Sequence, residues 1–314
     1  MIGLKNNFIF APIKTGYSDK TGVITEKHLI FYEARSKFIG AVTPEPLYIA
    51  RGLRELPTQI GIDCDDKIEG LKKLTDAIHQ FDTKVIAHLN HPGRMANPGI
   101  PENYFLSSTD KACEMGGAIP KQMDKDDIQQ AISLFSKATI RAEKAGLYII
   151  ELQFGHGYLV AQFLSPKVNN RTDGYGGSFE NRIKLSLQIL DAVKSATDLP
   201  IIVRISGDEM IPDGIKLEEM IKFSKILKEK SVEAVHVSAG TVCNIPPWYF
   251  QHMFVPKGKT WEFARKIKQE ANIPTIYVGQ INSEDDVKNL TDNFKADYIA
   301  IGRALIADPD FVGK

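Results

Sequence analysis

Short apolar runs alternate along the chain with longer stretches in which apolar residues recur at helical spacing. The runs are rich in β-branched residues, and we expect strands at residues 8–13, 39–47, 84–91, 147–154, 200–206, 232–238, 274–279 and 296–302. We expect helices at residues 25–37, 65–81, 124–145, 178–196, 217–230, 260–271 and 283–294, and a short one near residue 304. This alternation predicts a parallel sheet whose strands are covered by helices on their outer face.

The number of repeats and the apolar strands point to a closed barrel. Nearly continuous apolar strands are typical of parallel sheets that are buried on both faces. Eight strand and helix pairs predict a (β/α)8 barrel, which we expect to form one domain over residues 1–314. An open doubly wound sheet is the alternative, but no strand is followed by a GxGxxG motif and no Walker loop is present.

Capping residues predict where two helices begin, and a run of loop-forming residues predicts one long loop. Thr25 is a suitable N-cap for the first helix, and Asp124 with Asp127 has the spacing of a capping box, with Asp in place of the usual Glu. Residues 92–123 form the longest irregular stretch, rich in Gly, Pro, Asn and Ser. Because this stretch follows the third strand, we expect it at the catalytic mouth of the barrel.

Composition narrows the class of protein. The chain has 314 residues, 43% of them hydrophobic and 25% charged, and its formal net charge is zero, which disfavours a general nucleic-acid or membrane-surface binder. No apolar stretch is long enough to span a bilayer, so we expect a soluble, cytoplasmic protein. Cys64, Cys113 and Cys243 are odd in number and widely spaced, so we expect neither a disulfide framework nor a zinc or iron–sulfur site.

Polar residues collect where the expected strands end. In β/α barrels the active site lies at the carboxyl ends of the strands. Those ends carry Pro12, Ile13, Lys14, Glu45, Pro46, His88, Asn90, His91, Gln153, His156, Tyr158, Arg204, Ser206, Asp208, Ser238, Gly240, Gly279, Gly302 and Arg303. We expect no metal centre, because His88 and His91 are three residues apart on a strand and therefore point to opposite faces.

The last two strand ends suggest a phosphate site. Gly279 and Gly302 allow backbone N–H groups to approach an anion closely, and Arg303 begins the short helix that follows. Barrels of this kind commonly bind phosphate after the seventh and eighth strands. The alternative is that both glycines serve only in turns and that Arg303 is solvated.

Several segments in order along the chain resemble the old yellow enzyme family. They are LKNNFIFAPIKTG (residues 4–16), KVIAHLNHPGR (84–94), ELQFGHGYLVAQFLSPKVNNRTDGYGGSFENR (151–182), IIVRISGDE (201–209), VGQINSEDDV (278–287) and ADYIAIGRALIADPDF (296–311). Within that family, the sequence is most similar to the branch of bacterial and archaeal NADH:flavin oxidoreductases, which includes the barrel of 2,4-dienoyl-CoA reductases. The resemblance covers almost the whole chain.

The resemblance implies that FMN binds at the barrel mouth, with NADH or NADPH as the electron donor. It places the backbone of Ala11, Pro12 and Ile13 along the flavin, Pro46 beside its ring, and Lys14 near flavin O4 and N5. It matches His88 to a Gln on the pyrimidine edge, Arg204 to an arginine near N1 and O2, and Gly279, Gly302 and Arg303 to the phosphate site. From the residues alone, Arg204 pairing with Asp208 or Glu209, and Lys14 pairing with a carboxylate such as Glu45, stay open.

The resemblance also implies a reaction. Gln153 and His156 match the pair that binds the carbonyl oxygen of the substrate, and Tyr158 matches the acid that protonates the α-carbon. We therefore expect an ene-reductase that acts on a small α,β-unsaturated carbonyl compound. The alternatives are an FMN-dependent amine dehydrogenase, demethylase or NADH oxidase on the same barrel, and a flavin-free phosphate-binding lyase or isomerase.

Three departures from the family pattern fall at this expected site. Gln153 replaces a His, His88 replaces a Gln, and Lys14 stands where relatives often have Thr, Cys or His. Relatives of the dienoyl-CoA branch continue into a cysteine-rich iron–sulfur motif and further nucleotide domains, whereas this sequence stops at Lys314. We expect either a barrel-only enzyme or one part of a longer protein, with a homo-oligomer among the possible states.

Overall fold

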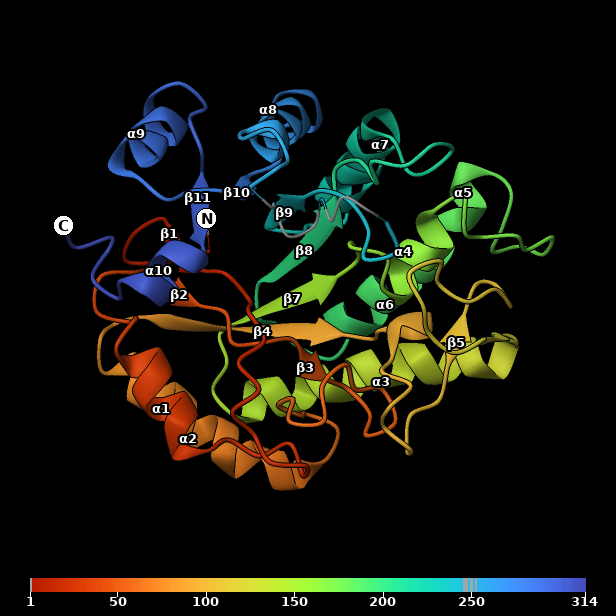
Figure 1. Ribbon diagram of the computed structural model, residues 1–314, viewed down its shortest axis with the longest axis horizontal. Coiled ribbons are helices and arrows are strands. Elements are labelled where there is room, and N and C mark those ends of the chain that lie inside the picture. Colours follow the sequence, from red (N-terminus) through yellow and green to blue (C-terminus); the bar gives the residue numbers. More distant parts are fainter. Residues whose placement is uncertain (1, 245–247, 249–250, 252) are drawn as a thin grey trace.

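Eight parallel strands close into a barrel in the computed structural model, which describes residues 2–244, 248, 251 and 253–314 (Figure 1). The strands are β1 (Phe8–Phe10), β2 (Ala41–Val42), β4 (Lys84–Asn90), β7 (Ile149–Gln153), β8 (Ile201–Ser206), β9 (Ala234–Ser238), β10 (Thr275–Val278) and β11 (Tyr298–Ile301). Their order is β2-β1-β11-β10-β9-β8-β7-β4, and pairing of β2 with β4 completes the ring. The predicted (β/α)8 barrel is confirmed.

Helices form the outer layer around the strands (Figure 1). The long ones are α1 (Glu26–Glu33), α2 (Ile68–His79), α3 (Lys125–Lys144), α6 (Lys184–Lys194), α7 (Leu217–Glu229), α8 (Lys259–Ala271) and α9 (Glu284–Asp292). Shorter elements are η1 (Asp65–Lys67), η2 (Gly93–Met95), α4 (Leu159–Leu164), α5 (Phe179–Arg182) and α10 (Arg303–Ala307). None of the helices in the described part of the chain is long and apolar enough to cross a membrane.

The predicted caps are present at the starts of α1 and α3. The Asp124 carboxylate accepts hydrogen bonds from the N–H groups of Asp126 and Asp127 at 3.0 and 2.9 Å, and the Asp127 carboxylate accepts from Asp124 N at 3.0 Å. At Thr25 the backbone N–H donates to His28 Nδ1 at 3.0 Å. Such contacts satisfy N–H groups that have no partner within the helix, and thereby fix where each helix begins.

Alternation along each strand separates two cores. One set of side chains faces outward against the helices, for example Val85, Ala87 and Leu89 of β4. The other set fills the barrel interior, where Ile86 of β4 meets Ile149 of β7 and equivalent residues of the other strands. Because side chains alternate between the two faces of a strand, the next inward residue on each strand lies one layer closer to the mouth.

Several predicted boundaries were wrong for identifiable reasons. The expected strand over residues 39–47 divides into β2 and β3 (Leu47–Tyr48), because Pro44 and Pro46 lack the N–H that a strand ladder requires. β3 pairs with the end of β4 as an extra strand at the mouth. The expected helix over residues 178–196 is divided at Ile183 into α5 and α6.

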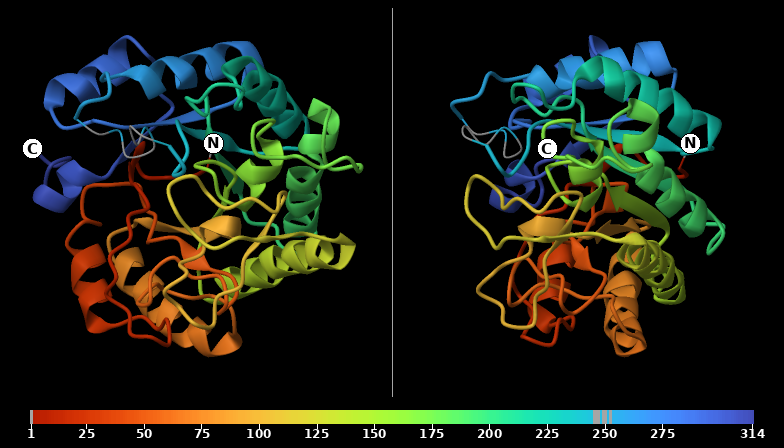
Figure 2. Two further views of the ribbon diagram at one scale, coloured as in Figure 1. Left: turned by 45° about the vertical axis from the view of Figure 1, so that its right-hand side comes forward. Right: turned by 90° about the vertical axis from the view of Figure 1, so that its right-hand side faces the viewer.

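Two long segments lie together on one side of the barrel. In the right-hand view of Figure 2, the segment that follows β4 and the described part of the segment that follows β9 lie on the same side. The first segment contains a small sheet formed by β5 (Leu106–Ser107) and β6 (Lys121–Gln122). These segments extend from the carboxyl ends of their strands, so they form part of the wall around the mouth, as predicted for residues 92–123.

Candidate active site

A cavity of about 840 Å³ opens at the carboxyl ends of the barrel strands. All of the predicted catalytic and cofactor-binding residues line it: Ala11, Pro12, Ile13, Lys14, Pro46, His88, Gln153, His156, Tyr158, Arg204, Gly279, Gly302 and Arg303. These residues are far apart in the sequence, and it is the closure of the barrel that brings them together. A cavity of this size is typical of small-molecule and cofactor sites.

The segment after β7 holds Gln153 and His156 in one hydrogen-bonded arrangement. Gln153 Oε1 accepts from Gly155 N at 3.1 Å, so the amide nitrogen of Gln153 is the atom that faces His156 Nδ1 at 3.2 Å. Since an amide nitrogen only donates, His156 Nδ1 is the acceptor and the ring proton lies on Nε2. Burial, aided by Arg204, lowers the pKa of His156 well below its usual value, so the ring is neutral.

Backbone geometry turns His156 toward the cavity. His156 has a φ of +61°, and its N–H donates to Ser206 Oγ at 2.9 Å. A Cβ atom at Gly155 would lie 2.7 Å from Ser206 N, so the chain approaches β8 too closely for a larger residue. The turn places Tyr158, which is the N-cap of α4, beside the His156 ring, with the ring centroids 6.4 Å apart. The segment from Gln153 to Tyr158 thus brings two donors of different kinds, His156 and Tyr158, to one wall of the cavity.

Arg204 and His88 present buried nitrogen atoms at the inner end of the cavity. Arg204 Nε and His88 Nε2 have no hydrogen-bond partner within the described part of the chain. Burial lowers the pKa of both groups. Arg204 forms no ion pair with Asp208 or Glu209 among the described residues. Buried polar atoms of this kind need a partner, which a bound ligand with acceptor and donor atoms would supply.

Another part of the cavity wall is formed by Gly279, which is packed too closely for a larger residue, and by Arg303. Gly279, after β10, has a φ of +109°, and a Cβ atom there would lie 2.8 Å from Gln251 Cγ and 2.9 Å from Thr260 Oγ1. Arg303, the first residue of α10, donates from Nη2 to Gln251 O at 3.0 Å and is otherwise exposed. A phosphate group could accept hydrogen bonds both from the glycine backbone and from this guanidinium group.

The described residues therefore fit FMN. The inner end offers hydrogen-bonding groups for the pyrimidine edge of a flavin, at Arg204 and His88. The β10–β11 side offers glycines and one arginine for a phosphate. The described residues contain no group of three or more His, Cys, Asp or Glu that could hold a metal ion.

Lys14 has a different carboxylate partner from the one considered in the sequence. Its ammonium group lies 2.5 Å from Glu55 Oε2 and 3.5 Å from the Tyr158 hydroxyl oxygen. Glu45 instead accepts from the Thr15 and Ile60 backbone N–H groups, at 2.6 and 2.7 Å. Glu55 was missed because it lies in an irregular segment after β3, with no sequence signal to place it at the mouth.

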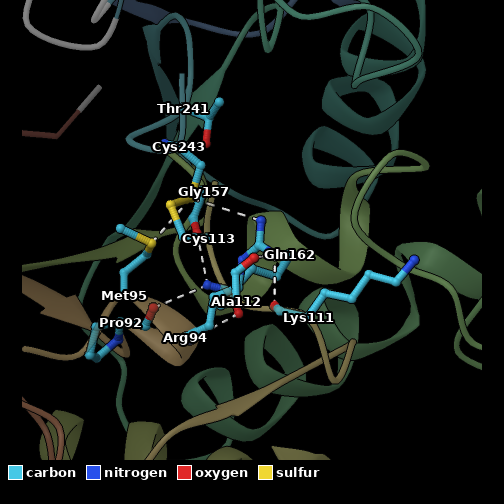
Figure 3. The surroundings of a disulfide bond; sticks show 10 residues. All are labelled: Pro92, Arg94, Met95, Lys111, Ala112, Cys113, Gly157, Gln162, Thr241 and Cys243. Carbon is cyan, nitrogen blue, oxygen red and sulfur yellow. Dashed lines mark hydrogen bonds between the residues drawn. A yellow bond between two sulfur atoms is a disulfide. The ribbon is translucent and has the colours of Figure 1, made fainter. Parts of the chain in front are cut away.

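The expectation of no disulfide was wrong. Cys113 and Cys243 form a disulfide across 130 residues, which joins the segment after β4 to the segment after β9 (Figure 3). Met95 and Arg94 lie beside it, with Arg94 Nη2 3.8 Å from Cys243 Sγ. The spacing of the two cysteines gave no hint of this pairing, because only closure of the barrel brings their loops together.

A second, smaller hollow of about 430 Å³ lies between these loops and the main cavity. It shares Lys14 and Tyr158 with the main cavity and is otherwise lined by Glu55, by Val242 and by the loop after β4, including Arg94, Met95 and Met115. Arg94 and Met95, which lie beside the disulfide, are thus also at the wall of this hollow.

Two inward-facing residues behind the cavity were also missed. Glu151 on β7 and His236 on β9 are each 1% exposed and lie two positions before Gln153 and Ser238. Strand alternation could have identified them, since residues two apart share a face and Gln153 was already placed at the site.

Comparison with known proteins identifies the family. A model of the NADH:flavin oxidoreductase / NADH oxidase family matches residues 1–314. NADH oxidase of Thermoanaerobacter brockii is 32% identical over 317 residues, covering 99% of this chain and 48% of that protein. NADPH dehydrogenase of Bacillus cytotoxicus is 35% identical over 316 residues, covering 99% of this chain and 88% of that protein.

The fold is shared with a solved structure of 2-naphthoyl-CoA reductase in complex with 2-naphthoyl-CoA. The TM-score is 0.93 at 24% identity, and the match covers all of this chain and 51% of the other. This chain thus spans about half the length of that protein and of the Thermoanaerobacter brockii NADH oxidase. From the family match over residues 1–314 and the 35% identity to the Bacillus cytotoxicus NADPH dehydrogenase, the chain belongs to the NADH:flavin oxidoreductase / NADH oxidase family of FMN-dependent oxidoreductases.

Proposed function

We propose that this chain reduces a C=C bond conjugated to a carbonyl group in a small-molecule substrate, with NADH or NADPH as the source of electrons. The observation that carries the proposal is the arrangement of Gln153, His156 and Tyr158 on one wall of the cavity. It combines a neutral hydrogen-bond donor with a phenol that can act as an acid. An enone requires both, one at its oxygen and one at its α-carbon.

FMN would be held by the residues that the cavity brings together. The backbone of Ala11, Pro12 and Ile13, with Pro46, would lie along the flavin, and His88 with Arg204 would bind its pyrimidine edge. Gly279, Gly302 and Arg303 would bind the phosphate. When bound and reduced by NADH or NADPH, FMN supplies the hydride for the β-carbon of the substrate.

His156 and Gln153 would orient and polarise the substrate carbonyl. The Gln153 amide fixes the proton of His156 on Nε2, so a neutral N–H is available to donate to the carbonyl oxygen. This hydrogen bond withdraws electrons from the double bond and stabilises the negative charge that develops on oxygen. The ring stays neutral because His156 is buried, which lowers its pKa, and Arg204 adds to this effect.

Tyr158 would supply the proton. Its hydroxyl group is at the cavity wall, and proton donation leaves a phenolate that the nearby Lys14 ammonium stabilises from 3.5 Å. Tyr158 is only 5% exposed, so packing of the surrounding residues holds its ring in place at the cavity wall. A phenol held in this way contributes a factor of about 10²–10⁴ to the rate of a step that needs its proton.

The experiment is a separation of the two half-reactions in Tyr158→Phe. We expect anaerobic reduction of the bound flavin by NADH or NADPH to proceed at nearly the wild-type rate. Reoxidation of the reduced enzyme by an α,β-unsaturated ketone should slow by about a hundredfold or more. Tyr175→Phe is the matched control, because the Tyr175 hydroxyl donates to Gln188 and is not at the cavity.

Equal slowing of both half-reactions would show that Tyr158 has a structural role only. The same apparatus tests the competing reaction class. If oxidised enzyme is bleached by an amine substrate while reduced enzyme is unaffected by enones, the barrel carries out amine oxidation instead. A purified protein that binds no flavin would overturn the proposal altogether.

A further inference from the structure

A buried charged group lies directly behind the cavity, on the neighbouring strands β4 and β7 and on β9, which is separated from β7 by β8. The Glu151 carboxylate on β7 is bonded on one oxygen to His88 Nδ1 of β4 and on the other to His236 Nδ1 of β9, the latter at 2.7 Å. All three side chains are at most 1% exposed. His88 lines the cavity, whereas Glu151 and His236 are not among the described residues that line it.

The hydrogen bonds define the state of each histidine. A carboxylate only accepts, so His88 and His236 each carry a proton on Nδ1. Burial lowers the pKa of both rings, that of His236 to about 4, so both are neutral near pH 7 and their Nε2 atoms are acceptors. His88 thus offers an acceptor, not a donor, at the inner end of the cavity.

Glu151 is the negatively charged member of this buried group of three side chains. Burial alone would raise its pKa, but the N–H groups that His236 and His88 donate to its two oxygens hold the pKa well below its usual range, so the carboxylate is ionised. The nearby buried cation is Arg204, whose guanidinium group interacts with Glu151 and lines the cavity. A buried charge is tolerated when another charge and hydrogen bonds compensate it.

We propose that Glu151 is a positioning residue of the flavin site, which holds His88 in the tautomer with an acceptor Nε2 and offsets the positive charge of Arg204. The inference rests on FMN binding in the cavity. Reduced flavin gathers negative charge at its pyrimidine edge, so Arg204 favours the reduced form and the Glu151 carboxylate opposes that effect. Glu151 thereby keeps the reduction potential lower than Arg204 alone would set it.

The first test is the midpoint potential of Glu151→Gln, which keeps the shape of the side chain and removes its charge. We expect reduction to be favoured by about tenfold in the equilibrium constant, which for a two-electron couple is a rise of about 30 mV. Glu209→Gln is the matched control. Glu209 is a buried carboxylate bonded to Ser165 Oγ and Ile215 N, it does not line the cavity, and its replacement should leave the potential unchanged.

A second measurement on the wild-type protein does not depend on a variant that folds. Two-bond ¹H–¹⁵N correlation spectra should show His88 and His236 as neutral rings protonated on Nδ1. Either ring protonated on Nε2, or as an imidazolium, would overturn the tautomer assignment. FMN content is measured first, because a protein without FMN would fail the proposed function, whereas a loaded Glu151→Gln protein with an unchanged or lower potential would overturn this inference alone.

Discussion

The ammonium group of Lys14 lies 3.5 Å from the hydroxyl oxygen of Tyr158, at the boundary between the main cavity and the hollow under the mouth loops. The same ammonium pairs with Glu55, which is held in turn by Asn90 Nδ2 at 2.9 Å. Lys14 is 32% exposed on its side chain, and Glu55 only 7%. The cation of Lys14 is therefore directed to the proposed proton donor and is already compensated by a carboxylate.

This geometry predicts which property Lys14 controls. Because Glu55 offsets the charge of Lys14, we expect Lys14→Thr to leave the midpoint potential of the flavin nearly unchanged. We expect the enone-dependent half-reaction to slow by about two- to fivefold, since a partly exposed ion contact is worth about 1 kcal/mol or less. Lys216→Thr, at an exposed lysine that does not line the cavity, serves as control. A fall of tens of millivolts in Lys14→Thr would instead place the ammonium at the flavin.

Arg303 should contribute to FMN affinity. Arg303→Ala removes a charge-assisted hydrogen bond to the phosphate, typically worth about 1.5–3 kcal/mol, so FMN affinity should fall by about ten- to a hundredfold. Fluorescence titration of the apoprotein with FMN measures this change. Arg265→Ala, which removes an exposed arginine paired with Glu262, should bind FMN as the wild type does. Wild-type affinity in Arg303→Ala would mean that the phosphate binds elsewhere.

The disulfide should stabilise the barrel. Cys113 and Cys243 are separated by 130 residues, and closing a loop of that length in the unfolded chain stabilises the folded state by about 3–5 kcal/mol. We expect Cys113→Ser to unfold at lower urea concentration than the wild type under oxidising conditions, and both to coincide in dithiothreitol. Cys64→Ser, at the free cysteine, should match the wild type throughout. A wild-type urea midpoint that does not respond to dithiothreitol would contradict the bond.

Two buried histidines predict loss of stability in mild acid. Burial lowers the pKa of His91 to about 3 and that of His236 to about 4, whereas both titrate near 6.5 in the unfolded chain. Below pH 6.5 the unfolded state binds more protons than the folded state, so stability falls as the pH falls. Each histidine contributes up to about 1.4 kcal/mol per pH unit over this window.

Urea midpoints at pH 7.5, 6.5, 5.5 and 5.0 measure this effect above the range where most carboxylates titrate. His91→Gln removes one of the titrating groups, so the decline in stability with falling pH should be smaller. The variant should keep the local structure, because Gln Oε1 can still accept the Gly93 N–H that His91 Nδ1 accepts at 3.0 Å. A midpoint that stays constant from pH 7.5 to 5.0 would mean that the histidines are charged in the folded protein.

The succession of strands and helices along the chain could be predicted from the sequence. Strands buried on both faces must be apolar throughout, and helices buried on one face must carry apolar residues at helical spacing. The same reasoning placed Gln153, His156 and Tyr158 at one mouth, because strand ends of a parallel barrel must meet there. Local chemistry was also sufficient for the cap at Asp124, which depends only on residues within one turn.

Contacts between distant segments could not be read in this way. Glu55 reaches Lys14, and Cys113 reaches Cys243, through irregular segments whose course no periodic pattern describes. Glu151 is bonded to His88 and His236 from strands that are not all neighbours, so its partners depend on the register and curvature of the closed barrel. The sequence determined which residues face inward, since that follows from local alternation, and only the tertiary structure decided which of them touch, since that depends on how the ring closes.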